Sequence, residues 1–111
     1  MKRGDIYFAS LDPTVGSETK KTRPVLIVSN NAANKASPVV SVVPLSSQLA
    51  RVFPFEVLLK STETGLSKDS KAMAQQVRTL DRRRLSAARA GSIATPSMLK
   101  VDAALRLHLD L

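Results

Sequence analysis

The residues with the clearest chemical potential lie in one polar, basic stretch, Gly16–Asn30. Within it, Lys20 and Lys21 precede Arg23 by only a few positions. A guanidinium group offers a planar fork of donors that stays charged, and this suits the recognition of phosphate or carboxylate groups. The stretch therefore predicts an anion-binding site built around Arg23.

Pro24 determines where Arg23 should lie. A proline removes one backbone donor and biases the preceding residue toward an extended conformation. The four residues that follow, Val25–Val28, are apolar, β-favouring and uninterrupted, as expected of a strand that is buried on both faces. The sequence thus predicts that Arg23 lies at the mouth of a rigid strand, where a loop runs into it.

Ser46 and Ser47 supply hydroxyl groups at the end of another predicted strand, just after Pro44. Serine hydroxyls in such positions often bond to nearby backbone, and without other information this structural interpretation is favoured. Neighbouring residues on a strand face opposite ways, so only one of the two serines can face a site beside Arg23.

Other catalytic groups are scarce. The one histidine, His108, lies between Leu107 and Leu109 in the C-terminal segment, where a helix-surface or helix-end position is expected rather than a catalytic one. There are no cysteines, so the chain has no thiolate nucleophile, disulfide or cysteine-based zinc site. The acidic residues follow no magnesium or calcium pattern, and the four glycines are scattered. No metal and no cofactor are expected.

Size and charge narrow the class of protein. The 111 residues, of which 43% are hydrophobic, suit one domain that spans residues 1–111. A formal net charge of +8 indicates a polyanionic partner, although a soluble protein can also simply be basic. The first residues carry no apolar block behind their charges, and no segment approaches the ~20 apolar residues of a membrane span. A cytoplasmic protein without membrane contact is therefore expected.

The hydrophobic pattern predicts mostly short strands. They cover residues 3–10, 23–29, 38–45 with a break at Pro44, 55–60 and 70–80. The last of these would also suit a helix on propensity, but the turn at 61–68 that contains Gly65 favours a strand. The connection 11–22 is long for so small a chain, and such loops tend to be functional. Residues 30–37 read as a short polar connection, and 81–85 as a helical turn capped by Asp81.

The clearest helix closes the chain. Thr95 is a good N-cap and Pro96 fits the first helical position. One apolar stripe follows at helical spacing: Met98, Val101, Leu105 and Leu109. Five or more short strands with a closing helix predict a mainly β fold (α+β), a small and strongly bent barrel.

Several motifs in order resemble the MazF/PemK family of toxin endoribonucleases. They are Arg3-Gly4-Asp5-Ile6-Tyr7, Leu11-Asp12-Pro13, Gly16-Ser17-Glu18, Lys21-Thr22-Arg23-Pro24-Val25, Val28-Ser29-Asn30, Pro44-Leu45-Ser46-Ser47-Gln48, Pro54-Phe55-Glu56-Val57, Gly65-Leu66-Ser67-Lys68-Asp69-Ser70 and Gln76-Val77-Arg78-Thr79-Leu80-Asp81. The resemblance covers nearly the whole chain and does not depend on any one motif.

This resemblance implies an SH3-like barrel of the MazF/CcdB/Kid type and a metal-independent nuclease. Arg23 matches the catalytic arginine of the family, and Ser46 matches the second catalytic residue, which is threonine in many members. Serine keeps the hydroxyl but restricts χ1 less. The implied partners are a single-stranded RNA substrate, a MazE/PemI-like antitoxin and a second copy of the chain in a homodimer.

The RNA-binding residues are expected in and beside these motifs. They are Ser17, Glu18, Thr19, Lys20, Lys21, Thr22, Ser47, Gln48, Arg51, Phe53, Gln76 and Arg78. Phe55 opens a strand and is expected in the core. Gln75 stands where many members have aspartate, which removes a carboxylate from that position. The run Arg82-Arg83-Arg84 is expected to be a solvated face.

Without a histidine pair, the expected chemistry is electrostatic. The 2′-hydroxyl of RNA attacks the adjacent phosphate, Arg23 stabilises the charge on the phosphorane, and Ser46 donates a hydrogen bond to the same oxygens. A guanidinium is a poor base at neutral pH, so Arg23 is not expected to take the proton. Two other functions fit the same features: a non-catalytic nucleic-acid-binding barrel, and a toxin that inhibits a topoisomerase.

Overall fold

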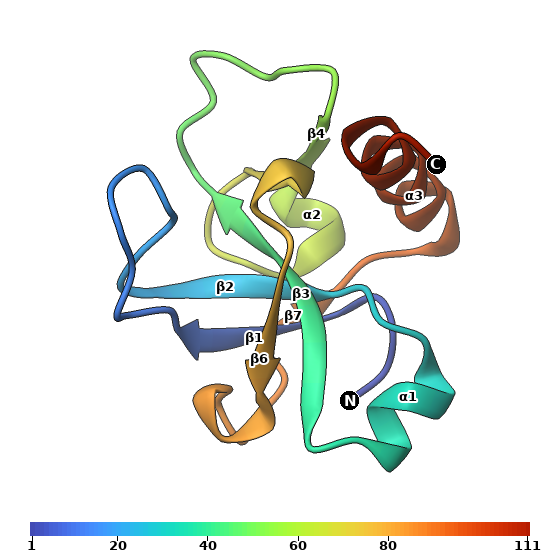
Figure 1. Cartoon of the computed structure of the whole chain (residues 1–111). Coiled ribbons are helices and arrows are strands. Elements are labelled where there is room, and N and C mark those ends of the chain that lie inside the picture. The colour runs from blue at the N-terminus through green and yellow to red at the C-terminus, as the bar shows by residue number, and fades with distance from the viewer.

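The computed structural model describes residues 1–111 (Figure 1). The strands are β1 (Asp5–Ser10), β2 (Thr22–Ile27), β3 (Val39–Ser46), β4 (Glu56–Leu59), β5 (Ser70–Met73), β6 (Arg78–Asp81) and β7 (Gly91–Ser92). The helices are α1 (Asn31–Ala36), α2 (Ser61–Thr64) and α3 (Thr95–Leu109), with 3₁₀ turns η1 (Ala74–Gln76) and η2 (Arg82–Arg84). No helix is both long and apolar enough to span a membrane.

The strands form one antiparallel sheet in the order β4-β5-β3-β2-β1-β7, and β6 also pairs with β3. β3 is the central strand. Its first half, Val39–Val42, pairs with β6, and its last residues, Leu45 and Ser46, pair with β5. Because one strand serves two partners in turn, the sheet curls into a half-barrel, which Figure 1 shows as the crossing of β3 and β6 over β1 and β2. The predicted fold, mainly β with a closing helix, is confirmed.

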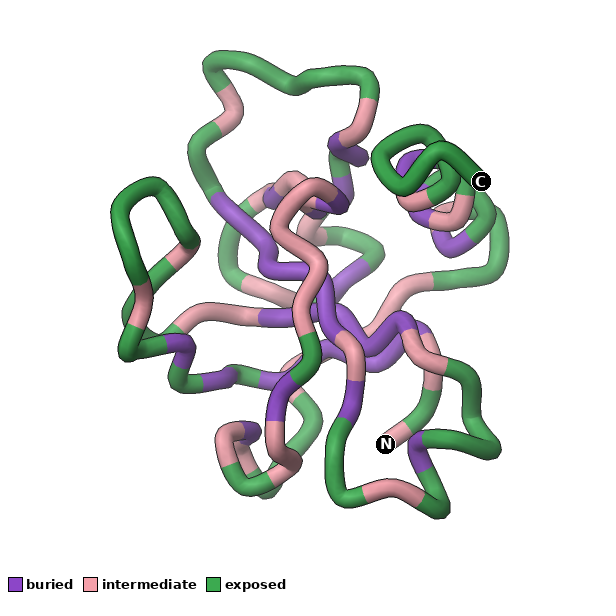
Figure 2. The backbone as a smooth tube through the Cα atoms, viewed as in Figure 1, coloured by how far each residue is buried: buried purple, intermediate pink, exposed green.

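Both faces of the central strands are buried. Alternate residues of β1, β2 and β3 enter two separate clusters, so that Leu26 and Val43 face one side while Val25 and Val42 face the other. The apolar run after Pro24 is therefore continuous because its strand is buried on both faces, as expected. Figure 2 shows the buried segments gathered where the strands cross.

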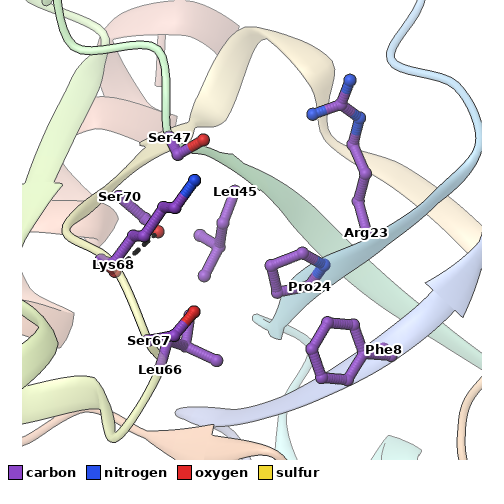
Figure 3. A pocket seen from close by; sticks show the side chains of 9 residues that line it. All are labelled: Phe8, Arg23, Pro24, Leu45, Ser47, Leu66, Ser67, Lys68 and Ser70. Atoms are coloured by element: carbon purple, nitrogen blue, oxygen red, sulfur yellow. Dashed lines mark hydrogen bonds between the residues drawn. The ribbon is translucent and has the colours of Figure 1, made fainter.

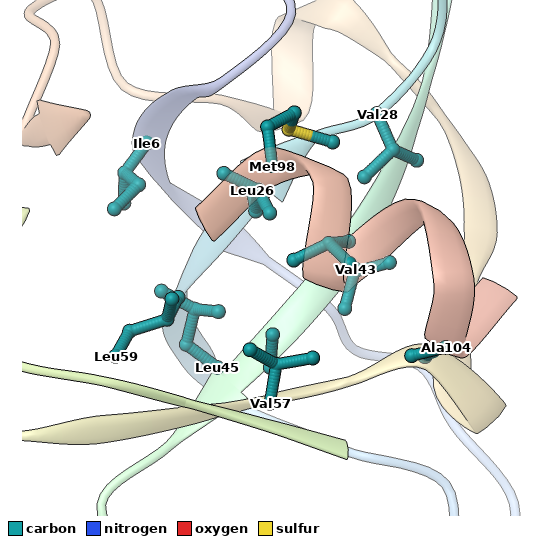
Figure 4. Packing of buried hydrophobic residues seen from close by; sticks show 12 residues of the cluster. Ile6, Leu26, Val28, Val43, Leu45, Val57, Leu59, Met98 and Ala104 are labelled. Atoms are coloured by element: carbon teal, nitrogen blue, oxygen red, sulfur yellow. The ribbon is translucent and has the colours of Figure 1, made fainter. Parts of the chain in front are cut away.

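Helix α3 covers the first of these clusters with Met98, Val101 and Ala104 (Figure 4). Two details differ from the prediction. Ala94 is the N-cap and makes no side-chain cap hydrogen bond, so Thr95 already lies in the helix. The predicted apolar stripe is also shorter, because Leu109 is 49% exposed and does not pack against the core cluster.

Pro44 does not break β3, contrary to the prediction. It pairs with Val25 of β2. On the other edge of β3, the pairs with β6 end at Val42 and those with β5 begin at Leu45. No neighbouring strand therefore requires the backbone N–H that Pro44 lacks.

Three connections also differ from the predictions. Residues 70–80 are two strands, β5 and β6, separated by η1, because a straight strand could not pair with both halves of the bent β3. Helix α1 replaces the predicted polar connection, and the Asn30 side chain caps it by accepting from Ala33 N at 2.8 Å. Helix α2 occupies part of the turn at 61–68 and ends at Gly65, which has φ +82°.

A buried ion pair ties the long loop before β4 to the sheet. The Glu56 side chain is 2% exposed, and its carboxylate accepts from Phe53 N at 2.9 Å, from Gln75 Nε2 at 2.7 Å and lies 3.2 Å from Lys71 Nζ. Lys71 Nζ also donates to Arg51 O at 2.7 Å. Burial acts to raise the pKa of Glu56, but these hydrogen bonds and the Lys71 charge outweigh it, so the pKa lies below its ordinary value of 4.5.

The Glu56→Gln variant is expected to lose roughly 3 kcal/mol of unfolding free energy at pH 7, because it leaves Lys71 buried without its counter-charge. A lowered folded pKa means that the stabilisation is present above pH 4.5 and is lost as the pH falls through the folded pKa. Urea unfolding should therefore separate parent and variant at pH 7 and bring them together in more acidic solution. The double variant Glu56→Gln/Lys71→Met should recover part of the loss. A single-variant loss that persists unchanged in acid would show that the ion pair is not its cause.

Candidate active site

Arg23 lies near the start of β2, as predicted, where it pairs with Ala9 of β1. Its Nε donates to Lys20 O at 2.9 Å, so the end of the loop holds the guanidinium. Arg23 forms no ion pair, and its two terminal nitrogens make no hydrogen bond to the protein. The side chain is half-buried. It is therefore fixed at one nitrogen and offers the other two to an anion.

A cavity of about 260 Å³ opens beside Arg23 (Figure 3). We call it the arginine cavity. Phe8, Pro24 and Leu45 form its apolar floor from three neighbouring strands. Polar side chains and one further apolar residue complete the lining: Ser47, Leu66, Ser67, Lys68 and Ser70. An apolar floor with a cationic rim suits a flat base that carries a phosphate.

Several of these residues were not predicted as site residues. Phe8 was assigned only to the first strand, yet it is 43% exposed and lines the cavity. Lys68 and Ser70 come from the segment after α2. The Ser70 hydroxyl donates to Lys68 O at 3.4 Å, and in Figure 3 the Lys68 side chain extends toward Ser47. Their motif was recognised in the sequence, but their place beside Arg23 depends on strand pairing.

The two candidate serines differ in their surroundings. Ser47 is exposed and lines the arginine cavity. Ser46 is 8% exposed, does not line that cavity, and its Oγ accepts from Gln48 N at 3.1 Å. The β2–β3 register pairs Val25 with Pro44, and alternation along both strands then puts Arg23 and Ser46 on the same face of the sheet. The parity of the strands thus favours Ser46 as the partner of Arg23, and cavity lining favours Ser47.

A second cavity of about 350 Å³ lies where the loop before β2 meets η1. We call it the loop cavity. Its lining is mostly polar: Glu18, Thr19, Pro44, Gln75, Gln76, Val77 and Arg78. Gln75 donates to Glu56, whose carboxylate can only accept, so the orientation of the amide is fixed and its Oε1 has no partner in the protein. Four predicted RNA-binding residues, Glu18, Thr19, Gln76 and Arg78, meet here.

The long β1–β2 loop is held in place by side chains from β6 and its neighbouring 3₁₀ turns. Gln76 accepts from Thr19 N at 3.2 Å and donates to Ser17 O at 3.3 Å. Arg78 donates to Leu11 O at 3.1 Å, and Arg84 donates to Asp12 O at 3.0 Å. These bonds fix the loop that carries the Lys20 carbonyl, which in turn holds Arg23.

The run of arginines is therefore not a uniformly solvated face, contrary to the prediction. Arg82 and Arg84 donate to backbone carbonyls. Only Arg83 is fully solvated, at 90% side-chain exposure, and it pairs with Asp81. The Arg83 guanidinium holds the pKa of Asp81 below its ordinary value. Asp81 caps η2 by accepting from Arg83 N at 2.9 Å, which confirms the predicted helical turn.

Other predicted residues lie outside both cavities. Lys20 and Lys21 are exposed on the loop, and Thr22 is exposed as the first residue of β2. Lys21 adopts a left-handed conformation with φ 69°. Gln48 and Arg51 are exposed on the segment between β3 and β4.

Phe55 is half-buried and outside the core clusters, so the prediction of a core position is wrong. Its ring stacks on Phe53 at 5.2 Å between centroids and meets His108 at 6.5 Å. Arg51 lies over the other aromatic ring of this pair, 5.3 Å from the Phe53 centroid. His108 lies on α3, away from both cavities, where the sequence placed it.

The Gln76→Met variant is expected to lower kcat about tenfold for the RNA cleavage that the family resemblance implies. The loop loses both hydrogen bonds to the Gln76 side-chain amide, so the Lys20 carbonyl no longer holds Arg23 in one position. Hydrogen exchange at the Thr19 amide should accelerate in the same variant, without a matching change at β3 amides. Thr79→Val, on the exposed side of β6, is a matched control. Loss of RNA affinity with an unchanged kcat and an unchanged Thr19 amide would instead make Gln76 a direct RNA contact.

The curled sheet presents a fixed arginine and two serines beside the arginine cavity and the loop cavity. This arrangement defines a class of protein that acts on phosphodiesters or binds them. The chain belongs to the PemK-like, MazF-like toxin family of type II toxin–antitoxin systems, whose family model matches residues 2–109. The resemblance to the MazF/PemK family that the sequence motifs indicated is thereby confirmed.

Characterised relatives share the full length of the chain. Endoribonuclease MazF9 of Mycobacterium tuberculosis is 43% identical, over 100% of this chain and 98% of that protein. Endoribonuclease EndoA of Bacillus subtilis is 38% identical, over 100% and 96%. Among solved structures, MazF of Deinococcus radiodurans superposes with a TM-score of 0.85 at 26% identity, over 100% of this chain and 97% of that one. A mycobacterial endoribonuclease in complex with its cognate antitoxin gives 0.82 at 28% identity, over 100% and 96%.

Proposed function

We propose that this toxin-family endoribonuclease cleaves single-stranded RNA at specific sequences, without a metal ion, and leaves 2′,3′-cyclic phosphate and 5′-hydroxyl ends. The observation that carries the proposal is the state of Arg23, which is anchored at Nε by Lys20 O and has both terminal nitrogens without a protein partner beside the arginine cavity. Family membership and the named endoribonuclease relatives support the general activity, which is cleavage of RNA by an endoribonuclease.

The proposed reaction is a transfer within the RNA. The 2′-oxygen forms a bond to the adjacent phosphorus, the bond from phosphorus to the 5′-oxygen breaks, and one proton passes from the 2′-hydroxyl to the departing 5′-oxygen by way of solvent. The terminal nitrogens of Arg23 stabilise the charge that accumulates on the phosphorane, and the Ser46 hydroxyl donates to the same oxygens. Preorganised donors of this kind act without a change of protonation at neutral pH, which suits a guanidinium.

The donor set supports the proposed independence from metal ions. Aspartate, glutamate and histidine side chains nowhere gather in a group of three or more that could hold an ion. A magnesium-dependent nuclease would need at least one or two carboxylates beside the phosphate. Glu18 is the one acidic residue that lines the loop cavity, and its carboxylate accepts from Val15 N at 2.8 Å.

Partners and assembly are proposed from the family. We propose that the chain acts as a homodimer of 111-residue single domains and is inhibited by a cognate MazE/PemI-like antitoxin. The inhibiting segment should be acidic and partly apolar, because the arginine cavity combines an apolar floor with Arg23 and Lys68.

The proposed function is tested with two RNAs of one sequence, one of which carries a 2′-deoxy nucleotide at the mapped cut site. In EDTA, the parent protein should cut the all-ribose RNA at discrete positions and leave cyclic phosphate and 5′-hydroxyl ends, because the attacking group belongs to the RNA. It should bind the deoxy-substituted RNA without cutting it. Abolition of cleavage by EDTA would exclude the metal-independent mechanism, and binding of both RNAs without any cleavage would indicate a nucleic-acid-binding module.

A further inference from the structure

A third cavity, of about 350 Å³, shares no lining residue with the arginine cavity. We call it the α1 cavity. Its lining comes from the N-terminal segment, α1 and η2: Met1, Lys2, Asn31, Asn34, Lys35 and Arg82. Helix α1, which supplies three of the lining residues, leads into the beginning of β3 (Figure 1). Ser46 is the last residue of β3, and Arg23 lies two residues before Val25, which pairs with Pro44 near that end. None of these residues was predicted as a site residue. Only Arg82 was noted in the sequence, as part of a run of arginines that was expected to be solvated.

The α1 cavity carries positive charge that no carboxylate balances. No acidic residue lines it. None of its three cationic side chains, Lys2, Lys35 and Arg82, takes part in an ion pair. Of the nearby carboxylates, Asp81 pairs with Arg83, while Asp5 pairs with Arg89 and accepts from the backbone Lys2 N at 3.0 Å. Three cations around one concave surface repel one another unless an anion lies between them.

Arg82 is held as a rigid donor in this cavity. Its Nη1 donates to Asn34 O at 2.6 Å and lies 3.5 Å from Ser37 O, so the end of α1 fixes the guanidinium. Asn34 is itself 1% exposed, and its Nδ2 donates to Ser29 O at 2.8 Å. The Nε and Nη2 atoms of Arg82 make no hydrogen bond to the protein. These two nitrogens form the edge of a guanidinium that binds phosphate through two parallel hydrogen bonds.

We propose that the α1 cavity binds a phosphate group of the RNA outside the bond that is cleaved, with Arg82 as the bidentate donor and Lys2 and Lys35 as charge partners. This inference rests on the proposed function. Eight residues of β3 separate the α1 cavity from the arginine cavity, up to about 25 Å for an extended strand. A phosphate bound there belongs to a flanking nucleotide, so the site contributes affinity for long substrates and does not act on the reacting atoms.

Inorganic phosphate is the first probe, because it tests the anion site without any RNA. Titration of the parent protein should shift the NMR signals of Arg82 Nε and of the Asn31 side-chain amide, and the shifts should be largely lost in Lys2→Gln/Lys35→Gln. That double variant leaves the Arg82 contacts to α1 intact, so its fold is expected to be retained. Lys100→Gln/Arg106→Gln on the exposed side of α3 removes the same charge and serves as the control.

RNA binding then separates a site for free phosphate from a site for the substrate. The probe is an RNA with the 2′-deoxy substitution at the cut site, compared with one about ten nucleotides longer. Lys2→Gln/Lys35→Gln should reduce the affinity advantage of the longer RNA about tenfold relative to the control variant. The slope of log affinity against log salt should become shallower by about 0.7, the value for one phosphate on a single strand.

Each result decides the proposal. Phosphate-induced shifts together with the reduced advantage of long RNA would support it. Shifts without any effect on RNA would make the α1 cavity a site for free phosphate and overturn the RNA contact. No shift, with RNA binding equal to that of the control variant, would overturn the anion site altogether. If the parent cuts no RNA, the proposed function fails separately, and the binding comparison remains valid with unmodified RNA.

Discussion

Replacing Arg23 by lysine is expected to lower kcat/KM by a factor of about 10² to 10³, the usual effect of removing a preorganised donor to an oxyanion. Charge is retained in this variant, so the loss measures the geometry of the guanidinium. Lysine has no planar fork, and it cannot bond Lys20 O through one nitrogen while presenting two others to a phosphate. Single-turnover cleavage of a defined RNA, with product ends mapped, measures the effect.

Two controls make the Arg23 result interpretable. Arg106→Lys, on the exposed face of α3, makes the same chemical change away from the cavities and should cleave as the parent does. Thermal unfolding of Arg23→Lys should remain within the range of a surface substitution, since Arg23 contributes one hydrogen bond. Cleavage by Arg23→Lys at the parental rate would remove the fork from the mechanism and leave charge as the only contribution of this residue.

Replacing Ser46 by alanine is expected to lower kcat about 10²-fold with little change in KM, because the hydroxyl is proposed to bond the phosphorane rather than the ground state. Ser46→Thr keeps the hydroxyl and restricts χ1, so it should retain or improve the parental rate. Ser46→Ala also removes the acceptor for Gln48 N, at a cost of about 1 kcal/mol of unfolding free energy. Urea unfolding separates this structural loss from the kinetic one.

The companion variant Ser47→Ala decides between the two serines. Ser47 lines the arginine cavity beside Lys68, so its loss should raise KM more than it lowers kcat. If Ser47→Ala reduces kcat as strongly as predicted for Ser46→Ala, and Ser46→Ala does not, then the catalytic hydroxyl belongs to Ser47. The strand-parity argument would then fail, because β3 leaves β2 after Pro44 and the two strands need not stay in register.

The parts of the fold that depend on local pattern were predictable. The apolar run Val25–Val28, the Asp81 cap and the helix after Pro96 are each specified by a few consecutive residues, and each lies where the sequence placed it within one or two positions. The loop-to-strand position of Arg23 was predictable for the same reason, since Pro24 restricts its backbone directly.

The parts that depend on pairing between distant segments were not predictable. Pro44 was expected to break its strand, but the gap between β5 and β6 on that edge removes the need for its N–H. Lys68 joins the arginine cavity only because β5 pairs with the end of β3. Phe55 appeared to be a core residue because it opens an apolar strand, yet its partners are Phe53 and His108 from the end of α3.

The closure of the β1–β2 loop has a consequence for how such toxins can diversify. Ser10 and Thr22, at its two ends, pair directly with one another, so the sheet is complete without the loop. Each doubling of a loop's length costs only about 0.6 kcal/mol of closure entropy. Insertions at the exposed tip around Gly16, away from the buried Leu11 and from the Lys20 carbonyl, are therefore expected to leave the core and the Arg23 contact intact. Under the proposed function, this tip is the place to graft loop segments from relatives in order to test whether the loop sets the sequence preference.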